Sequence, residues 1–336
     1  KLSGTHALAY MRSRKGQGDG SDISRIGRQQ QLISAMLREL QDKNYVTDPG
    51  SLISFLQAAI SSVNVSPNLG NASSDASLLI NVLQKMGAII SVDTDRTIRI
   101  EGVAKLTGYR HTALPDRIEA ASWGAAALAT RGDIYVRGAH QPDMTTFLNT
   151  FRKVGGAFDI DTDGIRFYHP GEPLHSIALE TAVHPGFMTD WQQPLVVALT
   201  QAEGLSIVHE TVYENRFGFT EALRKMGANI QVYRECLGGT ECRFGQRNFY
   251  HSAVISGPTP LTGADIVVPD LRGGFSHIIA ALAAKGTSHV SGVELIARGY
   301  ENFEEKLKGL GANFEVLARK ASKAPKPDAA IVVVEP

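Results

Sequence analysis

The sequence predicts an α/β fold built from three repeated βα units, with helices buried inside and sheets outside. First, an Ala-rich helix ends three times at a glycine, Gly132, Gly204 and Gly286, at spacings of 72 and 82 residues. Second, a later helix closes on a Gly-Ala pair, and these pairs begin at Gly87, Gly156, Gly227 and Gly311. Regular spacings of this size indicate one supersecondary unit copied several times. Each glycine suits the left-handed residue that ends a helix, directly before a strand.

Length and composition narrow the class of protein. A chain of 336 residues is about two domains long on the usual prior. Its 34 basic and 34 acidic side chains balance, which argues against a nucleic-acid partner. No apolar run approaches the roughly 20 residues that cross a bilayer, so we expect no membrane segment. Because the chain starts at Lys1 without a methionine, we expect it to be a fragment.

Residues 1–70 do not share the repeat. Ala7–Arg14 alternates apolar and basic residues like a strand, and Asp22–Leu40 reads as a helix with Asp22 as its N-cap. Four arginines flank the Gly-rich loop between these two elements: Arg12, Arg14, Arg25 and Arg28. Four converging guanidiniums would bind a pyrophosphate, because each donates two parallel hydrogen bonds. The alternative is a solvated basic face.

The motifs LSGTHALAYMRSR and RIGRQQQ resemble the end of the catalytic domain of the LytR–CpsA–Psr family. That family transfers glycopolymers from a polyprenyl pyrophosphate carrier to peptidoglycan outside the membrane. The resemblance implies that Arg12, Arg14, Arg25 and Arg28 bind the lipid pyrophosphate. It covers only about the first 75 residues and lacks the family's metal-binding acidic residues, so we expect no catalysis from this segment.

Three segments follow from this division. We assign residues 1–76 to the LytR–CpsA–Psr-like fragment and a Ser/Asn/Pro-rich linker, 77–318 to the repeat, and 319–336 to a tail that begins with a Lys/Pro/Ala-rich stretch. Within the repeat, a helix ends at Met86 and strands are expected at Ile89–Val92 and Ile98–Val103. The three full units are expected at 111–158, 180–230 and 262–316.

The starts of the helices carry the candidate chemistry, since a helix N-terminus attracts anions. Asp116, with Glu119 three residues on, reads as an N-cap, and Asp270 reads the same way. Asp190 is two residues closer to its helix-ending glycine, at the place that Arg272 takes in the next unit. One carboxylate and one guanidinium at equivalent helix starts indicate either a site or simple caps.

Two further arginines lie where a strand leads into a helix. Arg298 precedes the last helix, and Arg216 lies at a similar position one unit earlier. The alternative for both is an exposed salt-bridge residue.

The motifs LPDRIEA, HPGFMTDWQ, HETVYENRF, PDLRGG and ARGYE, in this order, resemble the UDP-N-acetylglucosamine 1-carboxyvinyltransferase family over residues 77–318. The resemblance implies two inside-out α/β barrels of three units each, of which this chain holds all but the first strand of one and the last piece of the other. The implied substrates are phosphoenolpyruvate and UDP-N-acetylglucosamine, in peptidoglycan precursor synthesis. The implied site is Asp190 as the base, Val212 as a backbone contact of the UDP-sugar, and Arg272 and Arg298 on phosphoenolpyruvate.

The resemblance leaves three functions open. The family's lysine and its proton-donating loop cysteine belong to the barrel that this chain lacks, and neither Cys236 nor Cys242 takes that role. The chain is therefore an enolpyruvyl transferase that needs a missing first barrel, a non-catalytic half-site in a chimeric chain, or a glycopolymer transferase through its first segment. We expect no cofactor and no metal, and a cytoplasmic location for the barrel. The location outside the membrane implied by the first segment conflicts with this.

Overall fold

A computed structural model describes residues 74–93, 97–238, 244, 247–317 and 331–334. The chain divides into two compact units, residues 1–70 with 87–106, and residues 71–86 with 107–336. In the first, β1 (Ile89–Val92) and β2 (Ile98–Glu101) form an antiparallel hairpin. This hairpin falls within residues 77–318, the segment that the sequence pattern assigns to the repeat. The predicted arginines Arg12, Arg14, Arg25 and Arg28 lie outside the described residues, as does Cys242.

The second unit begins with α4 (Ser74–Lys85) and then contains the three predicted repeats. The first repeat consists of α5 (Arg117–Ala129), β3 (Asp133–Arg137), α6 (Gln141–Lys153), β4 (Ala157–Ile160) and β5 (Gly164–Tyr168). The second consists of β6 (Ala178–Glu180), α7 (Thr189–Leu199), β7 (Gly204–His209), η1 (Arg216–Phe219), α8 (Thr220–Lys225), β8 (Asn229–Tyr233) and β9 (Ser252–Gly257). The third consists of β10 (Asp265–Val267), α9 (Gly274–Ala283), β11 (Ser288–Ser291), η2 (Val293–Arg298), α10 (Phe303–Gly309), β12 (Phe314–Leu317) and β13 (Ile331–Val334).

Each repeat contributes one sheet. The strand orders are β3-β5-β4, β6-β7-β9-β8 and β10-β11-β13-β12. Within the last two sheets β6 and β10 run parallel to their neighbours β7 and β11, and the remaining pairs are antiparallel. The three sheets stay separate in the described part of the chain, so the barrel is a ring of units and not a closed ring of strands.

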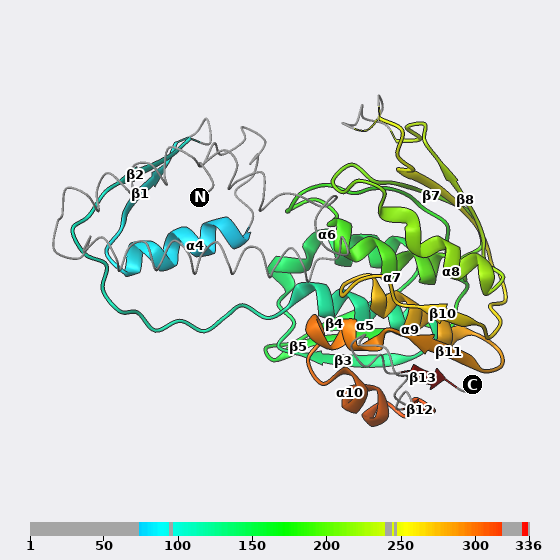
Figure 1. The fold of residues 1–336 in the computed structure, drawn as a ribbon. Helices are drawn as coiled ribbons and strands as arrows, with labels where there is room; N and C mark the ends of the chain where they lie inside the picture. The colour runs from blue at the N-terminus through cyan, green and yellow to red at the C-terminus, as the bar shows by residue number, and fades with distance from the viewer. Residues whose placement is uncertain (1–73, 94–96, 239–243, 245–246, 318–330, 335–336) are drawn as a thin grey trace, which may run out of the picture. The chain divides into compact units, whose positions relative to one another are not determined.

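Helices α5, α7 and α9 form the centre, inside the sheets (Figure 1). Nearly every residue of α5 from Ala120 onward and of α7 from Trp191 onward is buried. A helix that is apolar or small on all sides belongs in a core, and the alanines of α5 let its neighbours approach closely. At Gly124 an added Cβ would lie 3.0 Å from Phe167 of β5. The predicted arrangement, helices inside and sheets outside, is confirmed.

One of the three helix ends differs from the prediction. Gly204 and Gly286 take the predicted left-handed conformation, with φ of +98° and +86°. In the first repeat, however, Arg131 adopts it, with φ of 55°, and Gly132 does not. The helix therefore turns one residue earlier than its glycine indicates.

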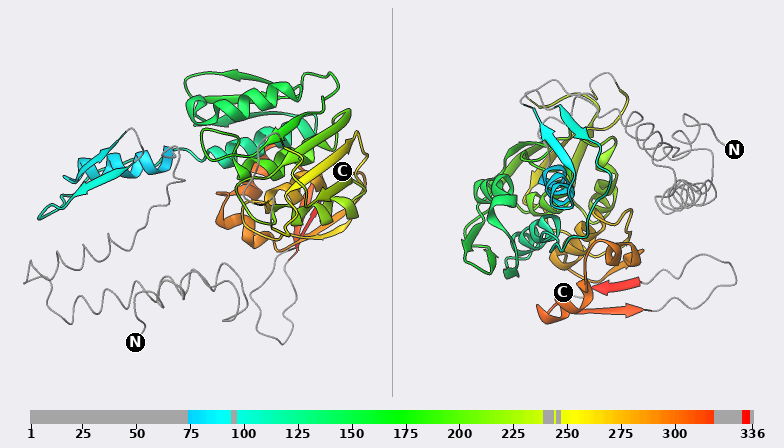
Figure 2. Two further views of the ribbon diagram at one scale, coloured as in Figure 1. Left: turned by 90° about the horizontal axis from the view of Figure 1, so that it is seen from above. Right: turned by 90° about the vertical axis from the view of Figure 1, so that its left-hand side faces the viewer.

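The assignment of residues 319–336 to a tail is wrong for Ile331–Val334. These four residues form β13, which pairs with β11 and β12 in the third sheet (Figure 2). The run Ile-Val-Val-Val is β-branched throughout, which favours a strand. The Lys/Pro/Ala-rich composition before it concealed this signal.

Candidate active site

The N-terminal ends of α5, α7 and α9 lie together at one end of the core. Trp191 Nε1 of α7 donates to the carbonyl of Arg117 in α5 at 3.2 Å. A Cβ on Gly273, just before α9, would lie 2.0 Å from the side-chain oxygen of Gln193 in α7. Three helix starts in contact gather partial positive charge and peptide N–H groups in one place.

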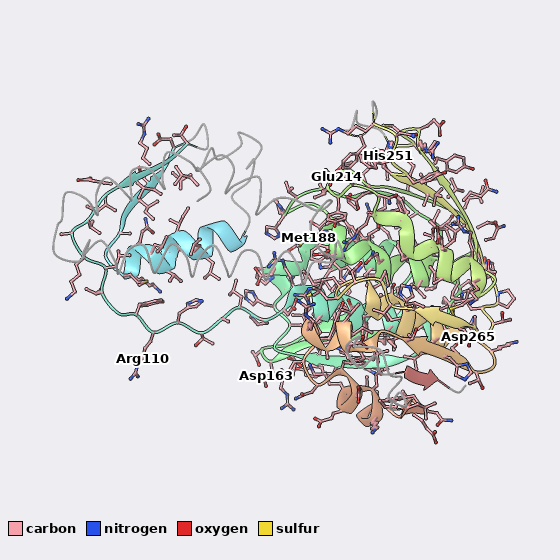
Figure 3. The ribbon with its side chains drawn as sticks, viewed as in Figure 1. Arg110, Asp163, Met188, Glu214, His251 and Asp265 are labelled. Carbon is pink, nitrogen blue, oxygen red and sulfur yellow. The ribbon has the colours of Figure 1, made fainter. Side chains whose placement is uncertain are left out.

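The three aspartates at these starts do different things. Asp116 caps α5, because its Oδ1 accepts from the N–H groups of Ile118 and Glu119 at 2.9 and 3.2 Å. Asp270 closes the turn before α9, where its Oδ1 accepts from the N–H groups of Arg272 and Gly273 at 2.9 and 2.6 Å. Asp190 lies in the first turn of α7, whose N-cap position is Met188 (labelled in Figure 3), and no side chain caps that helix. The interpretation of all three as simple caps therefore fails at Asp190.

Asp190 is held by Arg216, which forms an ion pair with its Oδ1. The Arg216 side chain is only 9 % exposed and stacks over the ring of Tyr213 at 5.0 Å. Arg216 therefore forms a salt bridge, as the alternative reading of the sequence predicts, but the salt bridge is largely buried and not exposed. Because the pair is largely buried, it fixes the direction of the Asp190 carboxylate more firmly than a surface pair would.

Arg272 is also held in place. Its Nη1 donates to Asp116 Oδ2 and to the carbonyl of Gly299, each at 2.7 Å, and its guanidinium lies 5.7 Å from the centre of the Tyr300 ring. Asp116 thus caps α5 with one oxygen and binds Arg272 with the other. The Arg272 side chain is only 26 % exposed.

Arg298, at the end of η2, is exposed and makes no ion pair with another described residue. It lines an open pocket of about 570 Å³ together with Asp116, Arg272 and Tyr300. The structure therefore brings Arg272 and Arg298 into one pocket. Asp190 does not line that pocket and lies at the neighbouring helix start.

Tyr300 lies between these groups. Its ring stacks on Phe275 at 4.6 Å, and its hydroxyl lies 2.9 Å from Ser122 Oγ and 3.2 Å from the carbonyl of Arg272. Burial raises the pKa of Tyr300 well above its usual range. The charges of Asp116 and Asp190 add to this rise, and the charge of Arg272 opposes it.

Glu210 was not singled out from the sequence. It follows β7 directly, is fully buried, and accepts five hydrogen bonds of 2.7 to 3.0 Å. The donors are Thr181 Oγ1, Thr189 Oγ1, Gln192 Nε2 and the N–H groups of Val212 and Tyr213. Glu210 thereby joins the first turn of α7 to the segment that contains Val212. The sequence signal was a carboxylate directly after an apolar strand.

Cys236 does not line the candidate site, and the described residues offer neither a metal site nor a membrane span. Cys236 is partly buried, and its Sγ lies 3.2 Å from His251 Nε2 near the start of β9. The described residues hold no group of three or more His, Cys, Asp or Glu that would bind a metal ion. No helix among them is long and apolar enough to span a membrane.

Comparison with known proteins identifies relatives of both segments. Residues 66–307 match the EPSP synthase (3-phosphoshikimate 1-carboxyvinyltransferase) family, and residues 1–84 match the LytR_cpsA_psr family. The chain is 55% identical over 250 residues to the UDP-N-acetylglucosamine 1-carboxyvinyltransferase of Protochlamydia amoebophila, a match that covers 74% of this chain and 54% of the relative. It is 49% identical over 242 residues to the enzyme of that name from Chlamydia abortus, covering 71% and 54%.

A solved structure agrees with the fold. The enolpyruvyl transferase NikO from Streptomyces tendae superposes with a TM-score of 0.61 at 26% identity, over 72% of this chain and 54% of that one. The chain therefore spans about half the length of the relatives it matches.

Proposed function

Because the chain belongs to the EPSP synthase (3-phosphoshikimate 1-carboxyvinyltransferase) family, we propose that residues 77–318 form one half of an enolpyruvyl transferase. The reaction proposed is transfer of enolpyruvyl from phosphoenolpyruvate to the 3-hydroxyl of UDP-N-acetylglucosamine, a step of peptidoglycan precursor synthesis. The observation that carries the proposal is that Arg272 and Arg298 line one pocket while Asp190 lies in the first turn of the neighbouring helix α7.

The pocket shared by Arg272 and Arg298 suits phosphoenolpyruvate. That substrate brings a phosphate and a carboxylate, which forked guanidiniums bind through paired hydrogen bonds. Arg298 is exposed and without a carboxylate partner among described residues, so its head is available to an anion. Arg272 already binds Asp116 through Nη1, and a substrate anion would use its remaining N–H groups.

Asp190 suits the role of base. As the new carbon–oxygen bond forms, the 3-hydroxyl must lose its proton to a positioned acceptor. The Arg216 pair directs the Asp190 carboxylate at the start of α7. For Val212, the N–H is already taken by Glu210 Oε1 at 2.7 Å, so a contact with the UDP-sugar would use another backbone atom.

Calorimetry of the full chain with UDP-N-acetylglucosamine tests the Asp190 assignment. We expect Asp190→Ala to weaken binding at least about tenfold, the loss of one charge-assisted hydrogen bond. Glu305→Ala, at an exposed position of α10, is the matched control and should bind like the unaltered chain. Equal affinity of all three proteins would show that the assignment is wrong.

Phosphoenolpyruvate binding tests the two arginines. We expect Arg272→Ala and Arg298→Ala to reduce it, and Arg110→Ala, an exposed arginine labelled in Figure 3, to leave it unchanged. Release of phosphate that depends on the UDP-sugar should be undetectable with this chain alone, because the family's lysine and loop cysteine belong to the half it does not match. Turnover on addition of a polypeptide that supplies the first barrel would support the proposal.

The match of residues 1–84 to the LytR_cpsA_psr family favours a second candidate, binding of a pyrophosphate lipid through Arg12, Arg14, Arg25 and Arg28. The test is vesicle binding with a polyprenyl pyrophosphate, lost on replacement of Arg12 and Arg14. The proposed location is the cytoplasm for the transferase half, where the nucleotide sugar is the substrate.

A further inference from the structure

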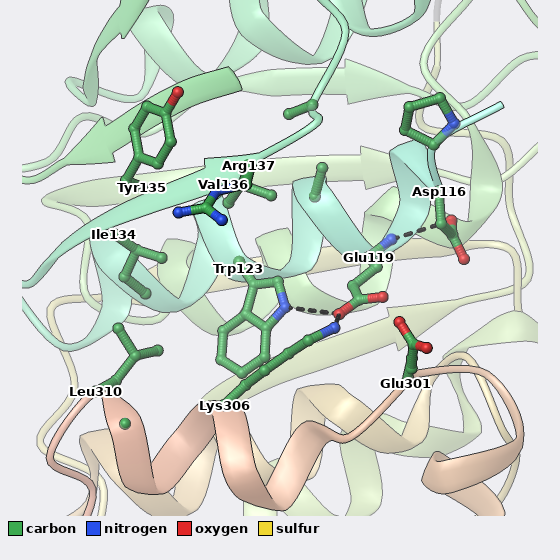
Figure 4. A pocket seen from close by; sticks show the side chains of 14 residues that line it. Asp116, Glu119, Trp123, Ile134, Tyr135, Val136, Arg137, Glu301, Lys306 and Leu310 are labelled. Carbon is green, nitrogen blue, oxygen red and sulfur yellow. Dashed lines mark hydrogen bonds and ion pairs between the residues drawn. The ribbon is translucent and has the colours of Figure 1, made fainter. Parts of the chain in front are cut away.

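The second repeat contains a thiol–imidazole pair that the proposed transferase does not use. Cys236, which follows β8, is partly buried, and its Sγ lies 3.2 Å from Nε2 of the fully buried His251, which precedes β9. The pocket drawn in Figure 4, of about 490 Å³, and the pocket shared by Arg272 and Arg298 are lined by residues of the first and third repeats. The pair therefore lies outside both pockets.

The hydrogen bonds of His251 indicate which ring nitrogen carries the proton. His251 Nδ1 lies 2.8 Å from the carbonyl oxygen of Phe249. A carbonyl only accepts, so Nδ1 is the donor, and in the neutral ring Nε2 keeps its lone pair. The Sγ–H of Cys236 therefore donates to His251 Nε2. A thiol that shares its proton with an imidazole can react as the thiolate, which is the nucleophilic form of cysteine.

A second buried imidazole, that of His209 at the end of β7, lies beside this pair. Its ring centre is 5.4 Å from that of His251. The hydroxyl of Ser252 has one hydrogen, which it donates to the carbonyl of Glu235 at 2.7 Å. Ser252 must therefore accept from His209 Nδ1, which lies 2.9 Å away. Burial lowers the pKa of His209, which favours the neutral ring with its lone pair on Nε2.

His209 Nε2 is a buried acceptor. The side chain is fully buried, and Nε2 has no hydrogen-bond partner among the described residues. The adjoining ring atom Cδ2 faces the segment that carries Cys236, since an added Cβ at Gly238 would lie 2.3 Å from it. A buried acceptor without a donor is unfavourable. The arrangement therefore favours a ligand that brings a hydrogen-bond donor to the space beside the thiol.

This acceptor discriminates among the reagents that a thiolate attacks. An alkylating reagent would place a carbon group beside His209 Nε2, which would still have no donor. A hydroperoxide converts the thiol to a sulfenic acid, and the new hydroxyl is a donor. The site therefore suits a hydroperoxide better than an alkylating reagent.

We propose that Cys236 is a hydroperoxide-reactive thiol, with His251 as the group that takes and returns its proton and His209 as the acceptor of the sulfenic hydroxyl. The Sγ–H proton passes to His251 Nε2, and the sulfur electron pair attacks one peroxide oxygen. The O–O bond breaks, and the leaving oxygen takes the proton from His251 and departs as water or as an alcohol. Sulfur is oxidised and the peroxide is reduced, so that with hydrogen peroxide R–SH + H₂O₂ gives R–SOH + H₂O. This assignment does not depend on the transferase proposal.

Hydrogen peroxide, with a cyclic 1,3-dione that traps sulfenic acids, tests the proposal in the full chain. The chain has two cysteines, and Cys242 lies outside the described residues. Cys242→Ser leaves Cys236 as the sole thiol, and Cys236→Ser is the matched control. Mass spectrometry measures the labelled fraction over time. We expect the Cys242→Ser chain to be labelled at least about tenfold faster than the control, and at least about tenfold faster folded than unfolded in urea.

Two further changes in the Cys242→Ser chain separate the roles of the histidines. His251→Gln keeps a polar side chain but not a base, so we expect the rate with peroxide to fall at least about tenfold. His209→Phe keeps a ring without an acceptor. We expect it to leave the rate with iodoacetamide unchanged and to shorten the lifetime of the sulfenic acid at least about threefold. Urea midpoints show whether each variant is folded; where one is not, the comparison of folded and unfolded Cys236 decides.

Four results would overturn the proposal. The first is equal labelling of the Cys242→Ser and Cys236→Ser chains, and the second is a Cys236 that reacts no faster in the folded chain than in urea. The third is an unchanged peroxide rate in a folded His251→Gln variant. The fourth is stoichiometric zinc in the purified chain with a thiol that is labelled only after chelation, because the pair would then be a set of metal ligands.

Discussion

Arg216 holds Asp190 through an ion pair that spans 26 residues of sequence, from η1 to the first turn of α7. The pair is mostly shielded from water. Removal of the arginine would therefore leave the Asp190 carboxylate in the first turn of α7 without its ion-pair partner. Asp190 would then turn toward solvent or toward Tyr300. Either change moves the proposed base away from one fixed direction.

We therefore expect Arg216→Met to lower the free energy of unfolding by about 1–3 kcal/mol. The same variant should weaken UDP-N-acetylglucosamine binding as Asp190→Ala does. Urea unfolding and calorimetry measure the two effects, and Arg224→Met, at an exposed position of α8, should change neither. In a double-mutant cycle with Asp190→Asn, additive losses would show that the two residues act independently.

Glu210 is expected to organise the segment around Val212. Glu210→Gln keeps the shape but replaces one accepting oxygen by an NH₂ group that must face two or three donors. We expect a loss of about 2–4 kcal/mol in urea unfolding, from donors left buried without a partner. Glu203→Gln, seven residues earlier and exposed, is the control and should stay within about 0.5 kcal/mol. A Glu210→Gln protein as stable as the control would contradict this role.

The plan of the fold was predictable because it depends on local signals. Gly204 and Gly286 end helices in the left-handed conformation that favours glycine, so their spacing revealed the repeat. Arg131 shows that this signal can miss the helix end by one residue, since Arg131 takes the left-handed conformation although a glycine follows it. β13 shows another, because its pairing with β11 joins segments about 40 residues apart and no local pattern specifies it.

The contacts around the candidate site residues could not be predicted from the sequence. The resemblance named Asp190, Arg272 and Arg298; Asp190 lies in the first turn of α7, and the two arginines line one pocket. The partners Arg216 and Glu210 could not be found in this way, because burial of a charged side chain depends on elements distant in sequence. For the same reason, the binding of Arg272 to Asp116, 156 residues earlier, was not foreseen.

The contact between Gly273 and Gln193 gives a prediction about how α7 and α9 meet. An added Cβ at Gly273 would lie 2.0 Å from the buried Gln193 amide, so one helix start must move. We expect Gly273→Ala to cost about 1–3 kcal/mol in unfolding free energy and to weaken phosphoenolpyruvate binding by shifting Arg272. Combining it with Gln193→Ala should recover part of both losses.

The control for this prediction is Gly309→Ala in α10, where nothing lies within 4 Å of the added Cβ. That change should be neutral or stabilise the protein by up to about 1 kcal/mol, because alanine is the better helix former. Similar losses at the two glycines would attribute the Gly273 effect to backbone propensity and not to Gln193.

His277 of α9 gives a prediction about pH. Burial lowers the pKa of His277 below its ordinary 6.5, and the hydrogen bond to Gly273 and the charge of Asp270 oppose this less strongly. The native state therefore keeps the ring neutral in a range where the unfolded chain binds a proton. The free energy of unfolding should fall as the pH drops below about 6.5, by up to about 1.4 kcal/mol per pH unit for one proton.

Urea unfolding of the unaltered chain and of His277→Leu between pH 8 and pH 5 measures this pH dependence. Packing differences between the two proteins are read at pH 8, where the ring is neutral in both states. We expect a shallower slope in the variant and not a flat one, since burial also lowers the pKa of His209. Parallel curves for the two proteins would show that His277 contributes nothing to the acid sensitivity of the core.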